Sequence, residues 1–361
     1  MTANRTPGAP ELLAADVMSA SAKVLAAGAA ERQAARGAEL PAEYQRLGVP
    51  DLTGDTVMRI QYLAAALFVR RPVLFFDHVS WQKAALAARG IGVESLATNL
   101  ECLEEEVSDR LPVEAAAAAA DYLSRARAVL TEVPAEVPSL LEGEGRHLDL
   151  ARQYLLAVLE ARRDDAVSLL TDAVAGGAPA PEVYRDVIMR AQAEIGRMWQ
   201  RNEVHVAEEH LGSRVAELAM TAVSALAPRA DANGRRVLCT STAGDLHDFG
   251  VRAVADHLEW SGYDALMLGA STPSADLMLA ISDFEADLVV VSASLSLHLR
   301  ALSQQIDAVR QRPEFDRVPI MVGGAPFARV DDLWQVVGAD GHALDFDGAV
   351  KAADDLLSRR D

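Results

Sequence analysis

Short apolar runs alternate with helix-like stretches in the last third of the chain, after the turn-rich segment 228–235. Four runs have the length and pattern of β-strands: 237–242, 265–269, 288–292 and 319–322. The stretches predicted to be helical are 251–261, 275–285, 299–312, 331–337 and 348–359. Alternating strands and helices favour a parallel sheet with helices on both faces. Residues 235–361 are therefore expected to form a doubly wound, Rossmann-like (flavodoxin-like) domain.

The rest of the chain has a helical pattern, so the expected fold class is multidomain, α and α/β. Residues 145–228 contain helical periodicity at about 147–159, 164–175, 181–201 and 205–226. Their short connections predict a four-helix bundle. Residues 37–138 are expected to form an all-α domain that ends in a proline-containing linker, and residues 1–36 an Ala-rich helical extension.

Composition narrows the classes of function. The chain has 34 Lys and Arg against 53 Asp and Glu, a net charge of -19, and no basic cluster, so direct DNA binding is not expected. The two cysteines, Cys102 and Cys239, are too few for a disulfide framework or a thiolate zinc site, and both fit apolar patterns. No uninterrupted apolar stretch approaches the roughly 20 residues of a membrane span. Without a secretory signal pattern either, a cytoplasmic protein is expected.

The loop 244–250, Gly-Asp-Leu-His-Asp-Phe-Gly, lies between the first strand and the next helix. Open α/β sheets bind ligands at such carboxyl-terminal strand ends. A lone histidine in a loop is usually solvated, but Asp245 lies two residues before His247 and can accept the other imidazole N–H. Gly250 lets the start of the helix approach a bulky group. We therefore interpret His247 as a metal ligand offered to a cofactor that brings its own metal.

Small and polar residues end the next strands. Ser292 and Ser294 follow the third strand, and Gly323-Gly324 follow the fourth. All converge on the sheet edge that carries His247. The chain has no phosphate-binding Gly-x-Gly-x-x-Gly and no Walker lysine, so an ordinary dinucleotide or triphosphate site is not indicated.

The order Asp-x-His-x-x-Gly, 41 residues, Ser-x-Ser, 28 residues, Gly-Gly resembles the cobalamin-binding signature. That signature is shared by methionine synthase, base-off mutases, corrinoid methyl carriers and cobalamin photoreceptors. The resemblance implies that His247 is the lower axial ligand of cobalt, backed by Asp245. It also implies that Ser292 and the Gly323-Gly324 turn line the channel for the nucleotide tail. Ser294 departs from the usual Leu or Thr.

The helical region adds a second pattern, in which Trp199 is followed by Glu209 and His210. Ordinary packing of Trp199 and an exposed Glu209-His210 pair would also explain it. The pattern resembles light-sensing repressors that bind adenosylcobalamin, in which the Trp and Glu shape the adenosyl pocket. Those repressors have an upper-ligand histidine directly after the Trp. Here Gln200 stands there, and an amide is a poor cobalt ligand, which leaves His205 or His210 as alternatives.

An all-α, globin-like domain ahead of such a module resembles the photocobilins, which add a bilin such as biliverdin. Candidate bilin contacts come from side-chain chemistry alone. His78 and Trp81, about one helical turn apart, could stack on a tetrapyrrole, although ordinary packing explains them equally well. Arg70, Arg71 and Arg89 could hold its propionates by charge-assisted hydrogen bonds.

These resemblances predict a light-sensing protein rather than an enzyme. Photolysis of the Co–C bond of adenosylcobalamin would rearrange the helical region against the Rossmann-like domain. The signal would pass to a homo-oligomer or a signalling partner. Two alternatives remain: a corrinoid methyl carrier for a separate methyltransferase, and an adaptor for which cobalamin is only a ligand.

Overall fold

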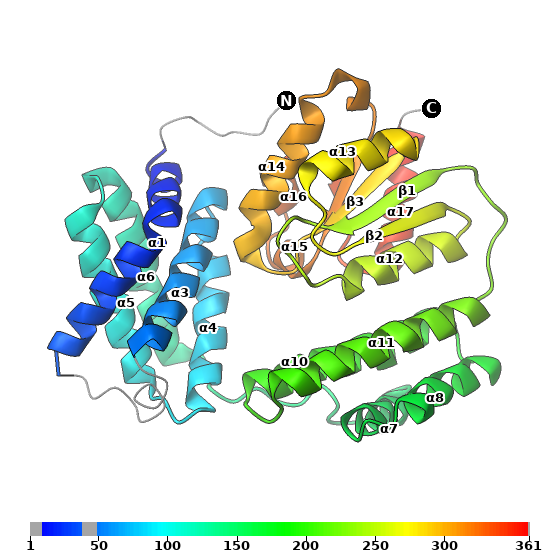
Figure 1. Cartoon of the computed structure of the whole chain (residues 1–361), viewed down its shortest axis with the longest axis horizontal. Coiled ribbons are helices and arrows are strands. Elements are labelled where there is room, and N and C mark those ends of the chain that lie inside the picture. Colours follow the sequence, from blue (N-terminus) through cyan, green and yellow to red (C-terminus); the bar gives the residue numbers. More distant parts are fainter. Residues whose placement is uncertain (1–8, 38–48, 360–361) are drawn as a thin grey trace. The chain divides into compact units, whose positions relative to one another are not determined.

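The computed structural model describes residues 9–37 and 49–359, and the chain divides into two compact units (Figure 1). Unit 1 comprises Met1–Val137 with Leu295–Arg300, and unit 2 comprises Pro138–Ser294 with Ala301–Asp361. Residues 1–8 of the expected amino-terminal extension and residues 38–48 of the expected all-α domain lie outside the described residues.

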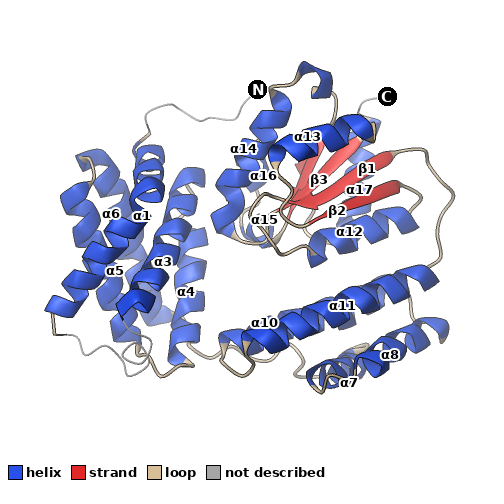
Figure 2. Cartoon of the chain, viewed as in Figure 1, coloured by secondary structure: helices blue, strands red, loops and turns tan. Residues whose placement is uncertain are grey.

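Every described regular element of unit 1 is helical (Figure 2). Its α-helices are α1 (Pro10–Ala35), α3 (Val49–Val69), α4 (Val73–Ala87), α5 (Val93–Arg110) and α6 (Val113–Glu132). The sequence analysis set the first helix apart as an extension, whereas α1 packs against α3, α5 and α6 in the structure. Pro72 and Pro112 precede α4 and α6, where a missing backbone N–H costs least. The all-α expectation is confirmed, and a globin-like arrangement stays a prediction.

The helix α1 is long and apolar enough to cross a membrane by length and composition, with a mean hydropathy of 1.4 over its most apolar window. Its side chains Ala14, Met18 and Leu25 are nevertheless buried within unit 1. Core helices of globular domains have the same composition. Hydropathy alone therefore does not assign α1 to a membrane.

Unit 2 contains a five-stranded parallel sheet in the order β2-β1-β3-β4-β5. The strands are β1 (Arg236–Ser241), β2 (Asp264–Gly269), β3 (Leu288–Ser292), β4 (Ile320–Gly323) and β5 (Gly341–His342). This order is that of flavodoxin-like doubly wound folds, which confirms the predicted Rossmann-like domain. The prediction of four strands was incomplete, because β5 has only two residues and no apolar run that would reveal it.

Helices cover both faces of the sheet. The helices α12 (Phe249–Trp260) and α17 (Phe346–Ser358) pack on the face formed by Val237, Cys239 and Val290. Figure 1 shows α13 (Ser274–Asp283) on the opposite side of the sheet from α12. The remaining α-helices of this domain are α14 (Leu299–Arg310), α15 (Ala325–Arg329) and α16 (Leu333–Val337). The carboxyl ends of the parallel strands therefore lie at one edge of the sheet, which is bordered by loops and helix ends.

The helical part of unit 2 shares one core with the Rossmann-like domain. Its elements are α7 (Leu148–Leu159), α8 (Arg163–Ala175), α9 (Ala180–Val183), the π-helical turn η1 (Tyr184–Met189), α10 (Arg190–Gln200) and α11 (Val206–Leu226). Trp260 of α12 is buried in this core and donates a hydrogen bond from Nε1 to Ser224 Oγ of α11 at 3.1 Å. The Tyr184 hydroxyl lies 2.7 Å from Asp256 Oδ2 of α12. The helix positions agree with the sequence analysis, and a four-helix-bundle topology stays a prediction.

Candidate functional site

The loop between β1 and α12 is anchored to the end of the sheet by short hydrogen bonds. Ser241, the last residue of β1, donates from its hydroxyl to the Asp245 carbonyl at 2.6 Å and accepts from the Ser271 amide at 2.8 Å. Gly244 has a φ of 89°, in the left-handed region that favours glycine, and its amide donates to Ser271 Oγ at 2.9 Å. The backbone conformation of the loop is therefore fixed from both β1 and the segment after β2.

Asp245 is fully buried, and its carboxylate is held by three donors. Oδ1 accepts from Nδ1 of His247 at 2.8 Å and from the His247 amide at 3.0 Å. Oδ2 accepts from the Ser294 amide at 2.6 Å. A buried carboxylate needs such partners, since an unpaired one would be strongly destabilising. Asp245 thus links the loop after β1 to the segment after β3.

His247 is consequently held in one tautomer. Nδ1 donates its hydrogen to Asp245, so the lone pair of the neutral ring is on Nε2. The His247 side chain is 60% exposed, and no described residue is hydrogen-bonded to Nε2. The hydrogen bond that His247 donates to Asp245 is the main cause that raises the pKa of His247 above its ordinary value. The arrangement presents an oriented imidazole nitrogen at the sheet edge.

The middle and last elements of the signature meet beside this loop. In the sheet, Ser292 of β3 is in register with Ser241 on one side and with Gly323 on the other. Ser292 is only 7% exposed, and its hydroxyl oxygen has no hydrogen-bond partner among the described residues. A buried hydroxyl is rarely left unsatisfied, so this one is suited to a polar group of a ligand.

Gly324 is required by close backbone packing. Its φ is 116°, and a Cβ placed on it would lie 2.1 Å from the carbonyl oxygen of Ala293. At Gly323 a Cβ would lie 3.2 Å from the Ala343 carbonyl oxygen. At Gly250, by contrast, a Cβ would meet no atom within 4 Å. Gly324 therefore shapes the protein itself, whereas the start of α12 is open, as the predicted approach of a bulky group requires.

The predicted upper-face residues lie at the end of α10 and the beginning of α11. Glu209 Oε2 is 2.8 Å from His210 Nδ1, and Glu209 Oε1 accepts from Ser213 Oγ at 3.0 Å. The negative charge of Glu209 also raises the pKa of His247, with a smaller effect than that of Asp245. His210 is 71% exposed, and Gln200 is buried.

Other predicted residues on these helices have different surroundings. His205, an alternative upper ligand, is the N-cap of α11 and accepts from the Glu208 amide at 3.3 Å, so it has a structural role. Trp199 is partly buried at the end of α10. No hydrogen bond or ring contact links Trp199 or Gln200 directly to His247 within the described residues.

The candidate bilin residues lie on α4, in unit 1. The His78 ring stacks on Tyr62 at a centroid distance of 3.5 Å, and Trp81 is a further 6.3 Å from His78. Burial, with a smaller contribution from Arg59, lowers the pKa of His78 to about 3. One face of the imidazole is therefore already covered by Tyr62. Its buried Nε2 has no hydrogen-bond partner among the described residues, and a bilin contact at this ring stays a prediction.

Two of the arginines proposed for propionates donate to nearby backbone carbonyls. Arg89 donates to the carbonyl of Ala85 at 2.7 Å, and Arg71 donates to the carbonyl of Arg70 at 3.0 Å. Arg70 retains one buried nitrogen without a hydrogen bond in the described chain. Both cysteines, Cys102 and Cys239, are buried and free, as expected for packing residues.

A polar network beneath the loop was missed by the sequence analysis. Gln305 of α14 is buried, accepts from Thr242 Oγ1 at 3.1 Å and donates to the Thr272 carbonyl at 3.0 Å. The Thr240 and Thr272 hydroxyls are 2.6 Å apart. The adjacent Thr and Ser residues at the end of β1 were the available signal, but nothing local pointed to Gln305.

The donor set fits a cofactor that supplies most of its own metal ligands. Within the described residues, no group of three or more His, Cys, Asp or Glu side chains is placed to hold a metal ion. A single oriented imidazole can complete the coordination of a metal that arrives in a macrocycle. The unpartnered Ser292 hydroxyl offers a contact for a polar tail of the same cofactor.

Comparisons with known proteins agree with this geometry. Residues 235–353 match the family described as B12 binding domain, and residues 150–224 match a second family with the same description. The dimethylamine corrinoid protein of Methanosarcina barkeri is 22% identical over 213 residues, covering 58% of this chain and 98% of that protein. Dimethylamine corrinoid protein 3 of Methanosarcina mazei is 25% identical over 168 residues, covering 46% of this chain and 99% of that protein.

A solved structure supports the fold. The monomethylamine corrinoid protein of Methanosarcina barkeri aligns with a TM-score of 0.52 and 20% identity, over 59% of this chain and all of that one. The reported relatives are named as corrinoid proteins, so they give no support to the expected photoreceptor subtype, the adenosyl form or a bilin. The chain therefore carries a cobalamin-binding module in unit 2, with a helical part at residues 150–224 and a Rossmann-like part at residues 235–353.

Proposed function

We propose that unit 2 binds a corrinoid in its base-off form, with His247 Nε2 as the lower ligand of cobalt. The observation that carries this proposal is the buried Asp245 carboxylate, which holds the Nδ1 hydrogen of His247 and leaves Nε2 available. Ser292 and the Gly323-Gly324 turn would receive the nucleotide tail.

Asp245 has two tasks in this proposal. Its hydrogen bond to Nδ1 fixes the ring orientation and makes Nε2 a stronger electron donor. By accepting from the Ser294 amide, the same carboxylate keeps the loop and the proposed tail channel at a fixed spacing. When bound, a corrinoid supplies a cobalt centre that carries an exchangeable alkyl group.

As the first function, we propose a corrinoid methyl carrier that serves a separate methyltransferase. This is supported by the relatives named dimethylamine corrinoid proteins, which match this chain over nearly their full length. In this role the chain is not itself the transferase. His247 would hold the cofactor, and the partly exposed Glu209 and exposed His210 would border the face that a partner approaches. We expect such a protein to work in the cytoplasm.

A light sensor is the second candidate, and two observations favour it. Trp199 at the end of α10 and Glu209 on α11 form the pattern of the adenosylcobalamin repressors, and the charge of Glu209 raises the pKa of His247. In addition, the domain matches begin at residue 150, so residues 1–137 of unit 1 lie outside them. In that role unit 1 would bind a bilin or pass the signal to a second copy or a signalling partner.

Absorption spectra test the shared proposal. Purified full-length protein should shift added cobalamin to a base-off, histidine-ligated spectrum, and His247→Ala should abolish that spectrum. His205→Asn is the matched control, because it removes an imidazole while asparagine keeps a good N-cap on α11. A variant His247→Ala with an unchanged spectrum would exclude His247 as the ligand.

The same preparations separate the two functions. A carrier should accept a methyl group from a methylamine-type methyltransferase and show the same oligomeric state in light and dark. A sensor should show a light-dependent spectrum and a light-dependent elution volume with adenosylcobalamin. If bound cobalamin responds neither to the methyltransferase nor to light, the adaptor role is supported, in which cobalamin is only a bound ligand.

A further inference from the structure

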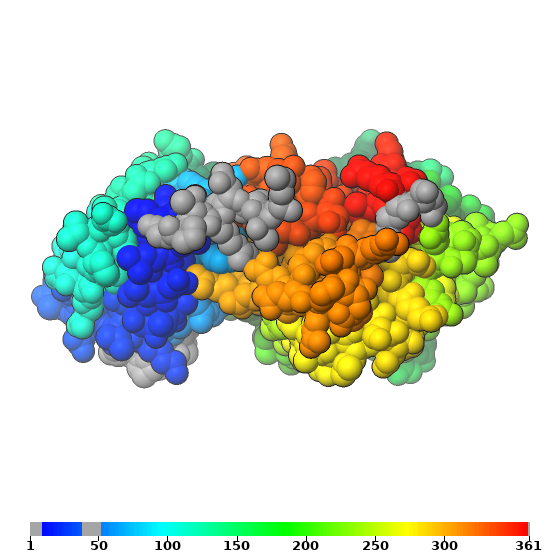
Figure 3. All heavy atoms as spheres, turned by 90° about the horizontal axis from the view of Figure 1, so that it is seen from above, coloured from blue at the N-terminus to red at the C-terminus, as the bar shows by residue number. Residues whose placement is uncertain are grey.

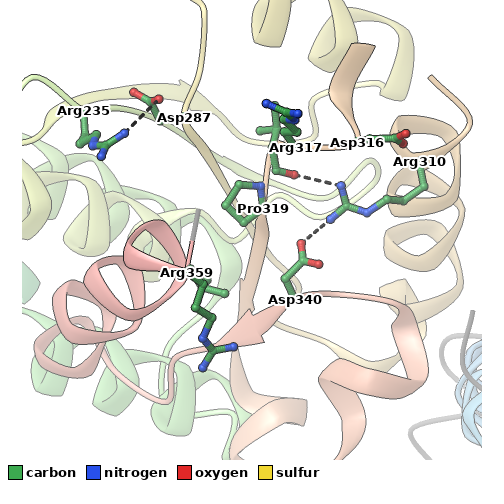
Figure 4. A pocket seen from close by; sticks show the side chains of 10 residues that line it. Arg235, Asp287, Arg310, Asp316, Arg317, Pro319, Asp340 and Arg359 are labelled. Atoms are coloured by element: carbon green, nitrogen blue, oxygen red, sulfur yellow. Dashed lines mark hydrogen bonds and ion pairs between the residues drawn. The ribbon is translucent and has the colours of Figure 1, made fainter. Parts of the chain in front are cut away.

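A cavity lies at the opposite edge of the sheet from His247. Its volume is about 660 Å³, and its lining includes the residues that directly precede four strands (Figure 4). These are Arg235 before β1, Asp287 before β3, Pro319 before β4 and Asp340 before β5. Because His247 follows the other end of β1, the two sites are separated by about the length of a strand, roughly 20 Å.

Two of the aspartates in this cavity are already engaged. Asp340 Oδ2 accepts from the Ile320 amide at 2.6 Å and pairs with Arg310. Asp287 Oδ2 accepts from the Arg236 amide at 2.9 Å, and its other oxygen is 3.9 Å from Arg235. These carboxylates hold the starts of β1 and β4 together with their arginines, so most of their charge is compensated.

Two other arginines are not compensated in this way. Arg317 and Arg359 line the cavity and are exposed, and neither forms an ion pair with any residue in the described ranges. Figure 4 shows Arg310 joined to Asp340, whereas Arg359 has no such contact. The remaining acidic side chain is Asp316. Four arginines against three aspartates make this a cationic region on a chain whose net charge is -19.

The region is accessible on the surface of unit 2. It is formed by the connection that follows α14, which is drawn in orange in Figure 3, and by the end of α17. Val318, Pro319 and Leu356 give the cavity a buried apolar floor beneath the charged rim. A floor of this kind lowers the local dielectric constant and strengthens charge interactions at the rim.

We propose that this cavity binds a small phosphate-bearing polyanion, with Arg317 and Arg359 as its principal ligands. Guanidinium groups present paired N–H donors that match phosphate oxygens, and such charge-assisted hydrogen bonds are about twice as strong as neutral ones. A multiply charged phosphate gains from both arginines and outweighs the repulsion from Asp316, whereas a monocarboxylate gains less. Binding here does not depend on the cobalamin site.

Isothermal titration of the full-length protein with pyrophosphate, at low ionic strength, tests this site. The matched variants are Arg317→Gln with Arg359→Gln, and Arg312→Gln as control, since Arg312 is exposed, lies near the same connection and is not part of the lining. Saturable binding to one site is expected, and the double variant should weaken it by about tenfold or more, because each lost charged hydrogen bond removes that order of affinity.

The outcomes are distinct. Binding that is lost in the double variant, unchanged in Arg312→Gln and unchanged in His247→Ala supports the site. Failure of pyrophosphate to bind overturns the proposed site. Equal weakening by Arg312→Gln also overturns it, because binding would then depend on the overall positive charge of the region and not on Arg317 and Arg359. Citrate provides the second arm: tighter binding of citrate than of pyrophosphate overturns the assignment to phosphate chemistry.

Discussion

Asp245→Asn is the substitution that most directly tests how the site is built. The native carboxylate accepts three hydrogen bonds: two on Oδ1 from His247 and one on Oδ2 from the Ser294 amide. An asparagine side chain has one acceptor oxygen, and its NH₂ group would face a donor. At least one charge-assisted hydrogen bond is therefore lost in a fully buried place.

The size of the effect follows from these contacts. A hydrogen bond to a charged group contributes about 1.5–3 kcal/mol, and a donor left facing another donor adds a desolvation cost of similar size. We expect the free energy of unfolding of cofactor-free unit 2 to fall by about 2–4 kcal/mol. Because the carboxylate also orients the metal ligand, cobalamin affinity should fall by about 10–100-fold.

Thermal unfolding of the cofactor-free protein and spectral titration with cobalamin measure the two effects. Asp248→Asn is the matched control, since it removes a carboxylate from the same loop that accepts no hydrogen bond from His247. Equal melting temperatures and equal affinities for Asp245→Asn and the native protein would refute the role assigned to Asp245. If Asp245→Asn lowers the melting temperature but leaves cobalamin affinity unchanged, only the proposed effect of Asp245 on the metal ligand His247 is refuted.

Further substitutions separate stability from binding. Ser292→Ala removes a buried hydroxyl that has no partner among the described residues, so the melting temperature of cofactor-free protein should stay equal or rise while cobalamin affinity falls in titration. Gly250→Ala should likewise leave the fold intact and weaken cobalamin binding. Gly324→Ala should lower the free energy of unfolding by about 2 kcal/mol or more, because its Cβ would clash with the Ala293 carbonyl and its backbone would be strained; chemical denaturation measures this loss. His78 has its pKa lowered to about 3, so its neutral form stabilises the fold above pH 6.5 and this contribution is lost as the pH falls toward 3. His78→Phe, which keeps an aromatic ring on Tyr62, should therefore resist acid better, by about 2 kcal/mol at pH 5 relative to pH 7; parallel pH-stability curves would contradict this.

Local pattern was sufficient for most of the secondary structure. The third strand is Leu288–Ser292 in the structure, as the sequence predicts, and the helix predicted at about 164–175 is α8, Arg163–Ala175. Apolar periodicity determines such elements because it is set by neighbouring residues. The two-residue strand β5 escaped detection because its pairing with β4 depends on the sheet and not on its own composition.

The sequence by itself determined where the candidate ligand lies and which strand ends carry its neighbours, since spacing and strand order are encoded along the chain. Only the tertiary structure showed that the Ser294 amide, 49 residues away, completes the shell of Asp245 and that Gln305 supports the loop from α14. It alone showed that no described residue is hydrogen-bonded to the Ser292 hydroxyl and that four arginines gather at the far edge of the sheet. Hydrogen bonds and burial depend on how distant segments pack, and a linear pattern does not record that packing.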